Sequence, residues 1–124
     1  VRFLQEEVLE NKALFVPTYG NTLMGLAASI PEELPQNGYS VTYYAPQPRA
    51  ILRVVDAEDT AVTKDYGEYG RVELTTLTHE FFMPRFLERD EAIRRKPHER
   101  YPWDGVGDVR PFGAMTKKVI EGVY

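Results

Sequence analysis

The sequence of 124 residues contains no cysteine, which excludes disulfide frameworks, thiolate zinc sites, iron–sulfur clusters and cysteine nucleophiles. No apolar run approaches the ~20 residues that a membrane-spanning helix needs, and the first residues lack the apolar stretch of a secretion signal. We therefore expect a cytoplasmic location and no membrane partner. The chain also begins without methionine, inside an expected helix, which is what a piece of a longer protein would show.

Common phosphate-binding and catalytic motifs are missing as well. The sequence has no P-loop, no dinucleotide-binding glycine fingerprint and no Gly-x-Ser-x-Gly nucleophile elbow. His79 and Glu80 begin like a zinc-protease helix, but Met83 stands where the second histidine is needed. The Gly-Val-Gly-Asp run at 105–108 is expected to form a turn, because no helical pattern follows it. The residues alone therefore predict no metal site.

Charge is unevenly distributed along the chain. The net charge of −4 argues against general binding of nucleic acid. Residues 1–80 carry a net charge of −6 and residues 81–124 carry +2, with the highest basic density at 94–96. This basic stretch is either a solvated face or a loop that faces an anion.

The pattern of apolar residues predicts a single β-rich α+β domain over 1–124, built as an antiparallel sheet or a distorted small β-barrel with one or two short helices. Strands are predicted where β-branched and aromatic residues gather, at 13–16, 40–44, 49–56, 71–78, 85–90 and 117–124. Helical segments are predicted at 1–11 and 23–30. Residues 94–111 are expected to be mostly loop, because proline, glycine and charge dominate there.

Two stretches carry side chains suited to a nucleotide. Tyr19, Gly20, Asn21 and Thr22 follow an expected buried strand, and they combine an aromatic face, close backbone approach and a hydroxyl. Asp90 is expected to end an arginine-bearing strand, where its carboxylate could accept both hydroxyls of a ribose. The alternatives are an ordinary turn for the first stretch and a surface salt-bridge ladder for the second.

The order of the motifs resembles adenylate-forming carboxylate ligases, and most closely the phenylacetate–CoA ligase branch. Tyr-Gly-x-Thr at 19–22 is followed by the strand sequence at 48–56, by Gly-Glu-Tyr-Gly-Arg-Val-Glu-Leu-Thr-Thr-Leu-Thr at 67–78 and by Pro-Arg-Phe-x-x-x-Asp at 84–90. The resemblance covers roughly residues 12–124, and Leu-Thr-Thr-Leu-Thr is its most specific part. Such enzymes join a carboxylic acid to ATP, release pyrophosphate and usually pass the acyl group from the adenylate to coenzyme A.

The resemblance implies a role for each candidate residue. Tyr19 would stack on adenine, Thr22 would contact the α-phosphate as the catalytic residue, and Asp90 would hold the ribose hydroxyls. Gly20, Asn21 and Arg110 would complete the nucleotide site. ATP with Mg²⁺ is the implied nucleotide, and coenzyme A is the implied acceptor.

The sequence also departs from the family. Leu23 stands where the family has a glutamate that helps to hold Mg²⁺, and Glu88-Arg89 replaces the Thr-Gly before the ribose aspartate. The family's phosphate loop and catalytic lysine are both missing. We therefore expect a sub-domain of a larger fold that is inactive alone. A fragment of this kind should expose an apolar patch, for which 23–30 is the candidate, and should form homodimers through it.

A second interpretation is a non-catalytic β-rich interaction module. In that case the stretch Arg85–Arg100 faces an acidic protein partner, and binding is insensitive to nucleotide and weakened by salt. A nucleotide footprint on Tyr19, Thr22 and Asp90 would separate the two interpretations.

Overall fold

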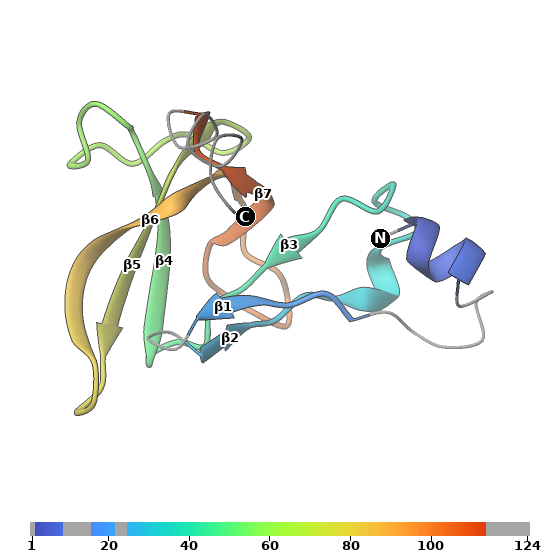
Figure 1. Ribbon diagram of the computed structural model, residues 1–124, viewed down its shortest axis with the longest axis horizontal. Coiled ribbons are helices and arrows are strands. Elements are labelled where there is room, and N and C mark those ends of the chain that lie inside the picture. The colour runs from blue at the N-terminus through green and yellow to red at the C-terminus, as the bar shows by residue number, and fades with distance from the viewer. Residues whose placement is uncertain (1, 9–15, 22–24, 114–124) are drawn as a thin grey trace, which may run out of the picture.

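The computed structural model describes residues 2–8, 16–21 and 25–113 (Figure 1). Two short helical turns lie in these ranges, η1 at Leu4–Val8 and η2 at Pro31–Glu33. The strands are β1 Tyr19–Asn21, β2 Gly25–Ala27, β3 Thr42–Tyr43, β4 Ala50–Val55, β5 Tyr69–Leu77, β6 Phe82–Arg95 and β7 Gly105–Pro111. Among the residues described, no helix is long and apolar enough to cross a membrane.

The strands form two antiparallel sheets, which confirms the predicted β-rich fold class. β1 and β2 make a small two-stranded sheet, and the other five strands make a sheet in the order β3-β7-β6-β5-β4. The larger sheet curls into a half-barrel, and the β1–β2 ribbon lies beside it toward the N-terminal end (Figure 1). β3 and β4 are therefore the two edges of the larger sheet.

The core lies on the inner face of β4 and β5. Leu52 pairs with Leu74 across these strands, and Val54 pairs with Val72, so alternate residues of both strands point to the same side. All four side chains are almost fully buried. The predicted strands at 49–56 and 71–78 are thus confirmed, because their alternating pattern matches a sheet with one buried face.

β6 differs from its prediction because it is much longer than 85–90. It runs for 14 residues, and Asp90 lies inside it opposite Pro111 of β7 rather than at its end. The pairing with β5 shifts between Leu74 and Thr76, and Arg85 in this irregular stretch has a φ of 58°. A bulge of this kind lets a long strand bend with the curl of the sheet.

The prediction that 105–108 forms a turn within a mostly looped 94–111 is wrong. This segment begins β7, which pairs with β6 on one side and β3 on the other. A Cβ added to Gly105 would lie 2.7 Å from Cγ2 of Thr42 and 2.8 Å from Cε1 of Tyr44. Glycine is needed here for close packing, and it also removes the β-branched signal by which a strand is recognised.

The predicted helix at 23–30 is also wrong in its described part. Residues 25–27 form β2, which pairs with β1, and Gly25 has a φ of 85° that favours glycine. Leu26 is 64% exposed, whereas Ala27 and Ile30 are buried, so these residues do not form the continuous apolar patch that was expected. The predicted strand at 117–124 lies outside the described residues. Of the predicted strand at 13–16, only Val16 is described.

Candidate functional site

Tyr19 begins β1 and lies against the edge of the core. Its ring is half-buried and packs on Tyr43 of β3, with the ring centroids 5.6 Å apart and the planes tilted by 34°. Aromatic rings at this separation attract each other beyond the effect of burial alone. The contact fixes Tyr19 between the small sheet and the half-barrel.

The hydroxyl of Tyr19 reaches the carboxylate predicted to hold a ribose. It donates a hydrogen bond of 2.8 Å to Oδ2 of Asp90 on β6. Burial of the phenol is the main reason why the pKa of Tyr19 is raised, followed by this hydrogen bond and by the negative charges of Asp90 and Glu88. Tyr19 is therefore a protonated donor at neutral pH. Within the described part of the chain, Oδ1 of Asp90 accepts no hydrogen bond.

The structure describes two of the three other residues of the Tyr-Gly-x-Thr motif. Gly20 pairs with Leu26 of β2, and a Cβ at Gly20 would collide with the carbonyl of Gly25. Asn21 ends β1 opposite Gly25. Thr22 lies outside the described residues. The structure thus explains the glycine by the close approach of β1 and β2, which is independent of any ligand.

Arg110 on β7 is held by neighbours other than Asp90. Its Nε donates a hydrogen bond of 2.7 Å to Oε1 of Glu91, and its guanidinium lies 3.8 Å from the centre of the Tyr69 ring. Glu91 and Arg110 are directly opposite each other on β6 and β7. Of the predicted nucleotide residues, the structure brings Tyr19 and Asp90 into contact and gives Arg110 a separate set of partners.

Three further residues of this region, Tyr43, Glu88 and Arg71, were not predicted from the motifs. Tyr43 supplies the ring that supports Tyr19, and Glu88 adds negative charge near its hydroxyl. Nη2 of Arg71 donates a hydrogen bond of 2.6 Å to the backbone carbonyl of Glu88. Arg71 alternates with the core residues of β5, and this alternation was the available signal that it faces away from the core.

The basic stretch that was expected to face an acidic partner is largely neutralised within the chain. Nη2 of Arg94 lies 2.9 Å from Oδ2 of Asp104, and Nη2 of Arg95 lies 3.0 Å from Oδ2 of Asp108. Arg85 pairs with Glu73, and Arg100 lies 3.6 Å from a carboxylate oxygen of Glu32. Most of these arginines therefore have acidic partners of their own.

No set of metal ligands is found in the described ranges. They contain no group of three or more His, Asp or Glu side chains that could hold an ion. Leu23, at the position of the family's glutamate, has an aliphatic side chain without a donor atom. The described residues thus do not fit a Mg²⁺ ion held by this part of the chain alone.

No protein-family model matches this chain, and no curated protein matches it.

Proposed function

We propose that this chain is the nucleotide-binding part of an adenylate-forming carboxylate ligase, the phenylacetate–CoA ligase-like type that its motifs resemble. The complete enzyme would activate a carboxylic acid with ATP, release pyrophosphate and transfer the acyl group to coenzyme A. The chain alone would bind nucleotide without turnover, because it lacks the phosphate loop and the catalytic lysine. Its location would be cytoplasmic, which fits the lack of cysteine.

The observation that carries the proposal is the contact between Tyr19 and Asp90. These residues were selected from two separate motifs 71 positions apart, for binding to adjacent parts of one nucleotide. Adenine and ribose are joined directly, so the residues that bind them must lie close together. If the fold kept the side chains of Tyr19 and Asp90 apart, they could not bind the adenine and the ribose of one nucleotide.

The chemistry of each group suits its assigned part. The Tyr19 ring offers a face to adenine, while its other neighbour is the Tyr43 ring. Asp90 is half-buried and retains Oδ1 as an acceptor for a ribose hydroxyl. Thr22 would supply a neutral donor to the α-phosphate. Mg²⁺ would enter with ATP in the complete enzyme.

Equilibrium binding of AMP to the full chain and two variants tests the proposal. Asp90→Asn keeps the size of the side chain but removes its charge, and we expect it to weaken binding about tenfold or more. Glu80→Gln makes the same change of charge at an exposed residue in the β5–β6 connection and should bind AMP like the unmodified chain. Equal affinity of all three proteins for AMP would overturn the proposal. The absence of binding at ~10 mM AMP would also overturn it, because the Kd would then be weaker than millimolar.

A further inference from the structure

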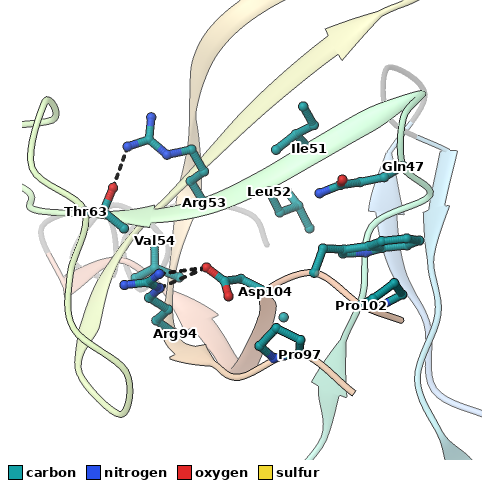
Figure 2. A pocket seen from close by; sticks show the side chains of 12 residues that line it. Gln47, Ile51, Leu52, Arg53, Val54, Thr63, Arg94, Pro97, Pro102 and Asp104 are labelled. Atoms are coloured by element: carbon teal, nitrogen blue, oxygen red, sulfur yellow. Dashed lines mark hydrogen bonds and ion pairs between the residues drawn. The ribbon is translucent and has the colours of Figure 1, made fainter. Parts of the chain in front are cut away.

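A cavity of about 410 Å³ lies along β4, and its volume is typical of ligand sites. Figure 2 shows the part between β4 and the connection from β6 to β7, with Leu52 and Val54 on the β4 side. Pro97 and Pro102 lie across from them, and Trp103 of the same connection also lines the cavity. An apolar cavity of ~150 Å³ is enough to hold benzene, so this one has room for two fused rings.

Trp103 is held in place by a row of aromatic contacts. The ring centroids of Trp103 and Tyr101 are 5.9 Å apart, and Tyr101 stacks on Tyr44 with the centroids 5.1 Å apart and the planes 13° apart. Tyr44 is buried, and the backbone N–H of Trp103 donates a hydrogen bond of 2.8 Å to the carbonyl of Tyr101. An aromatic wall that is already fixed favours flat ligands, because little side-chain freedom is lost when they bind.

The charged groups of the cavity wall already have partners. Nε and Nη2 of Arg94 donate hydrogen bonds of 3.0 and 2.9 Å to Oδ2 of Asp104, and Oδ1 of Asp104 accepts one of 2.6 Å from the Tyr66 hydroxyl. Arg53 turns to Thr63 on the other side of β4 (Figure 2). A charged ligand between β4 and the connection would therefore lose water without gaining an opposite charge, so the wall favours a neutral ligand.

Gln47 supplies a polar group that a neutral ligand can use. It lies in the connection from β3 to β4, where its backbone N–H donates a hydrogen bond of 2.9 Å to the carbonyl of Ala45. Figure 2 shows its side chain directed toward Leu52. The residue is half-buried, and its side-chain amide has no hydrogen-bond partner within the described ranges. A primary amide presents an N–H beside a C=O, so its best complement is a group with the same pair of atoms.

We propose that this cavity binds a neutral heteroaromatic lactam, which is a flat ring with an N–H next to a C=O. The Gln47 amide pairs with the lactam through two hydrogen bonds, and the ring packs against Trp103 and the side chain of Leu52. This site is independent of the nucleotide proposal, because neither Tyr19 nor Asp90 lines the cavity.

The first probes are 2-quinolone and its N-methyl derivative, which has the same rings and carbonyl but no N–H. The chain contains one tryptophan, so the indole N–H of Trp103 gives a single identifiable NMR signal. We expect 2-quinolone to shift this signal with a millimolar or lower Kd and to bind at least fivefold more tightly than the methylated compound. No shift of the Trp103 signal at millimolar 2-quinolone, or equal binding of the two compounds, would overturn the proposal.

Two matched variants test the role of Gln47. Gln47→Met keeps the length of the side chain and removes the amide, so this variant should bind both compounds with equal affinity. Gln36→Met makes the same change at an exposed glutamine outside the cavity and should retain the fivefold preference. A preference that persists in Gln47→Met would contradict the pairing between this amide and the lactam.

A third probe tests the requirement for a neutral ligand. A quinolone that carries an added carboxylate should bind at least threefold more weakly than 2-quinolone, because this side of β4 offers it no unpaired cation among the described residues. Tighter binding of the carboxylate would contradict the neutral class. The signals of 19–21 should not move with 2-quinolone, and shifts centred there would place the lactam at the proposed nucleotide site instead.

Discussion

The hydroxyl of Tyr19 and the carboxylate of Asp90 lie 2.8 Å apart, and their hydrogen bond joins the small β1–β2 sheet to β6 of the larger sheet. The bond is partly buried and is made by a phenol whose proton is retained because its pKa is raised. A single contact thus has two consequences that can be measured, one for the stability of the domain and one for its proposed ligand.

Tyr19→Phe removes the hydroxyl and keeps the ring on Tyr43. We expect the free energy of unfolding to fall by about 1 kcal/mol, which is the usual net worth of one intramolecular hydrogen bond. Asp90→Ala should cost a similar amount, and the double variant should lose less than the sum because both changes remove the same bond. Urea unfolding of the four proteins measures the coupling, and strictly additive losses would show that the bond contributes nothing.

The raised pKa of Tyr19 predicts a loss of stability at alkaline pH. The unfolded chain ionises its tyrosines near pH 10, whereas burial and the bond to Asp90 keep the folded phenol neutral beyond that pH. The contribution of Tyr19 is therefore complete below pH ~10 and declines as the pH rises above it, by at most about 1.4 kcal/mol per pH unit. Unfolding of the unmodified chain and of Tyr19→Phe should be compared between pH ~9 and ~11. Curves that remain parallel would contradict the raised pKa.

Glu73 is a carboxylate with 1% exposure that is shared by Arg53 and Arg85. Glu73→Gln leaves both guanidiniums without a negative partner, and we expect a loss of about 2 kcal/mol because both can still reach water. Arg85→Gln should cost less, about 0.5–1 kcal/mol, since Arg53 continues to pair with the carboxylate. Thermal or urea unfolding of the two variants gives the comparison. If Arg85→Gln lowered the free energy of unfolding more than Glu73→Gln does, Glu73 would not be the residue on which the ion pairs with Arg53 and Arg85 depend.

Alanine variants of Leu74 and Leu77 on β5 test which face of this strand packs into the core. Leu74 is fully buried and Leu77 is 50% exposed. Leu74→Ala should lower the free energy of unfolding by about 2–5 kcal/mol, and Leu77→Ala by about 0.5 kcal/mol or less. The two variants differ only in which face of one strand is shortened, so similar losses would contradict the assigned inner face.

The central strands could be predicted from sequence because their residues follow a single local rule. β4 and β5 are rich in valine, leucine, isoleucine and threonine, and their buried positions mostly alternate, with Val55 and Glu73 as exceptions. β7 could not be predicted in this way. Gly105 and Gly107 occur there because neighbouring side chains leave no space for a Cβ, which is a property of the assembled sheet.

Two of the residues selected from motifs, Tyr19 and Asp90, are in contact, but the features that bring them together could not be predicted. Tyr19 and Asp90 were identified from motifs, yet their contact depends on the path of β6, which continues through Asp90 instead of stopping there. Tyr43 could not be selected because its role requires β1 to lie next to β3.

The most direct test of the central claim is an amide chemical-shift titration of the full chain with AMP and, in parallel, with 2′,3′-dideoxy-AMP. If Tyr19 binds adenine and Asp90 binds ribose, AMP should shift the signals of 19–21 and of residues around Asp90. The dideoxy compound should retain the first group of shifts and lose the second, because it offers no hydroxyl to the carboxylate. Shifts centred elsewhere, or the same response to both compounds at Asp90, would contradict a nucleotide site built on these two residues.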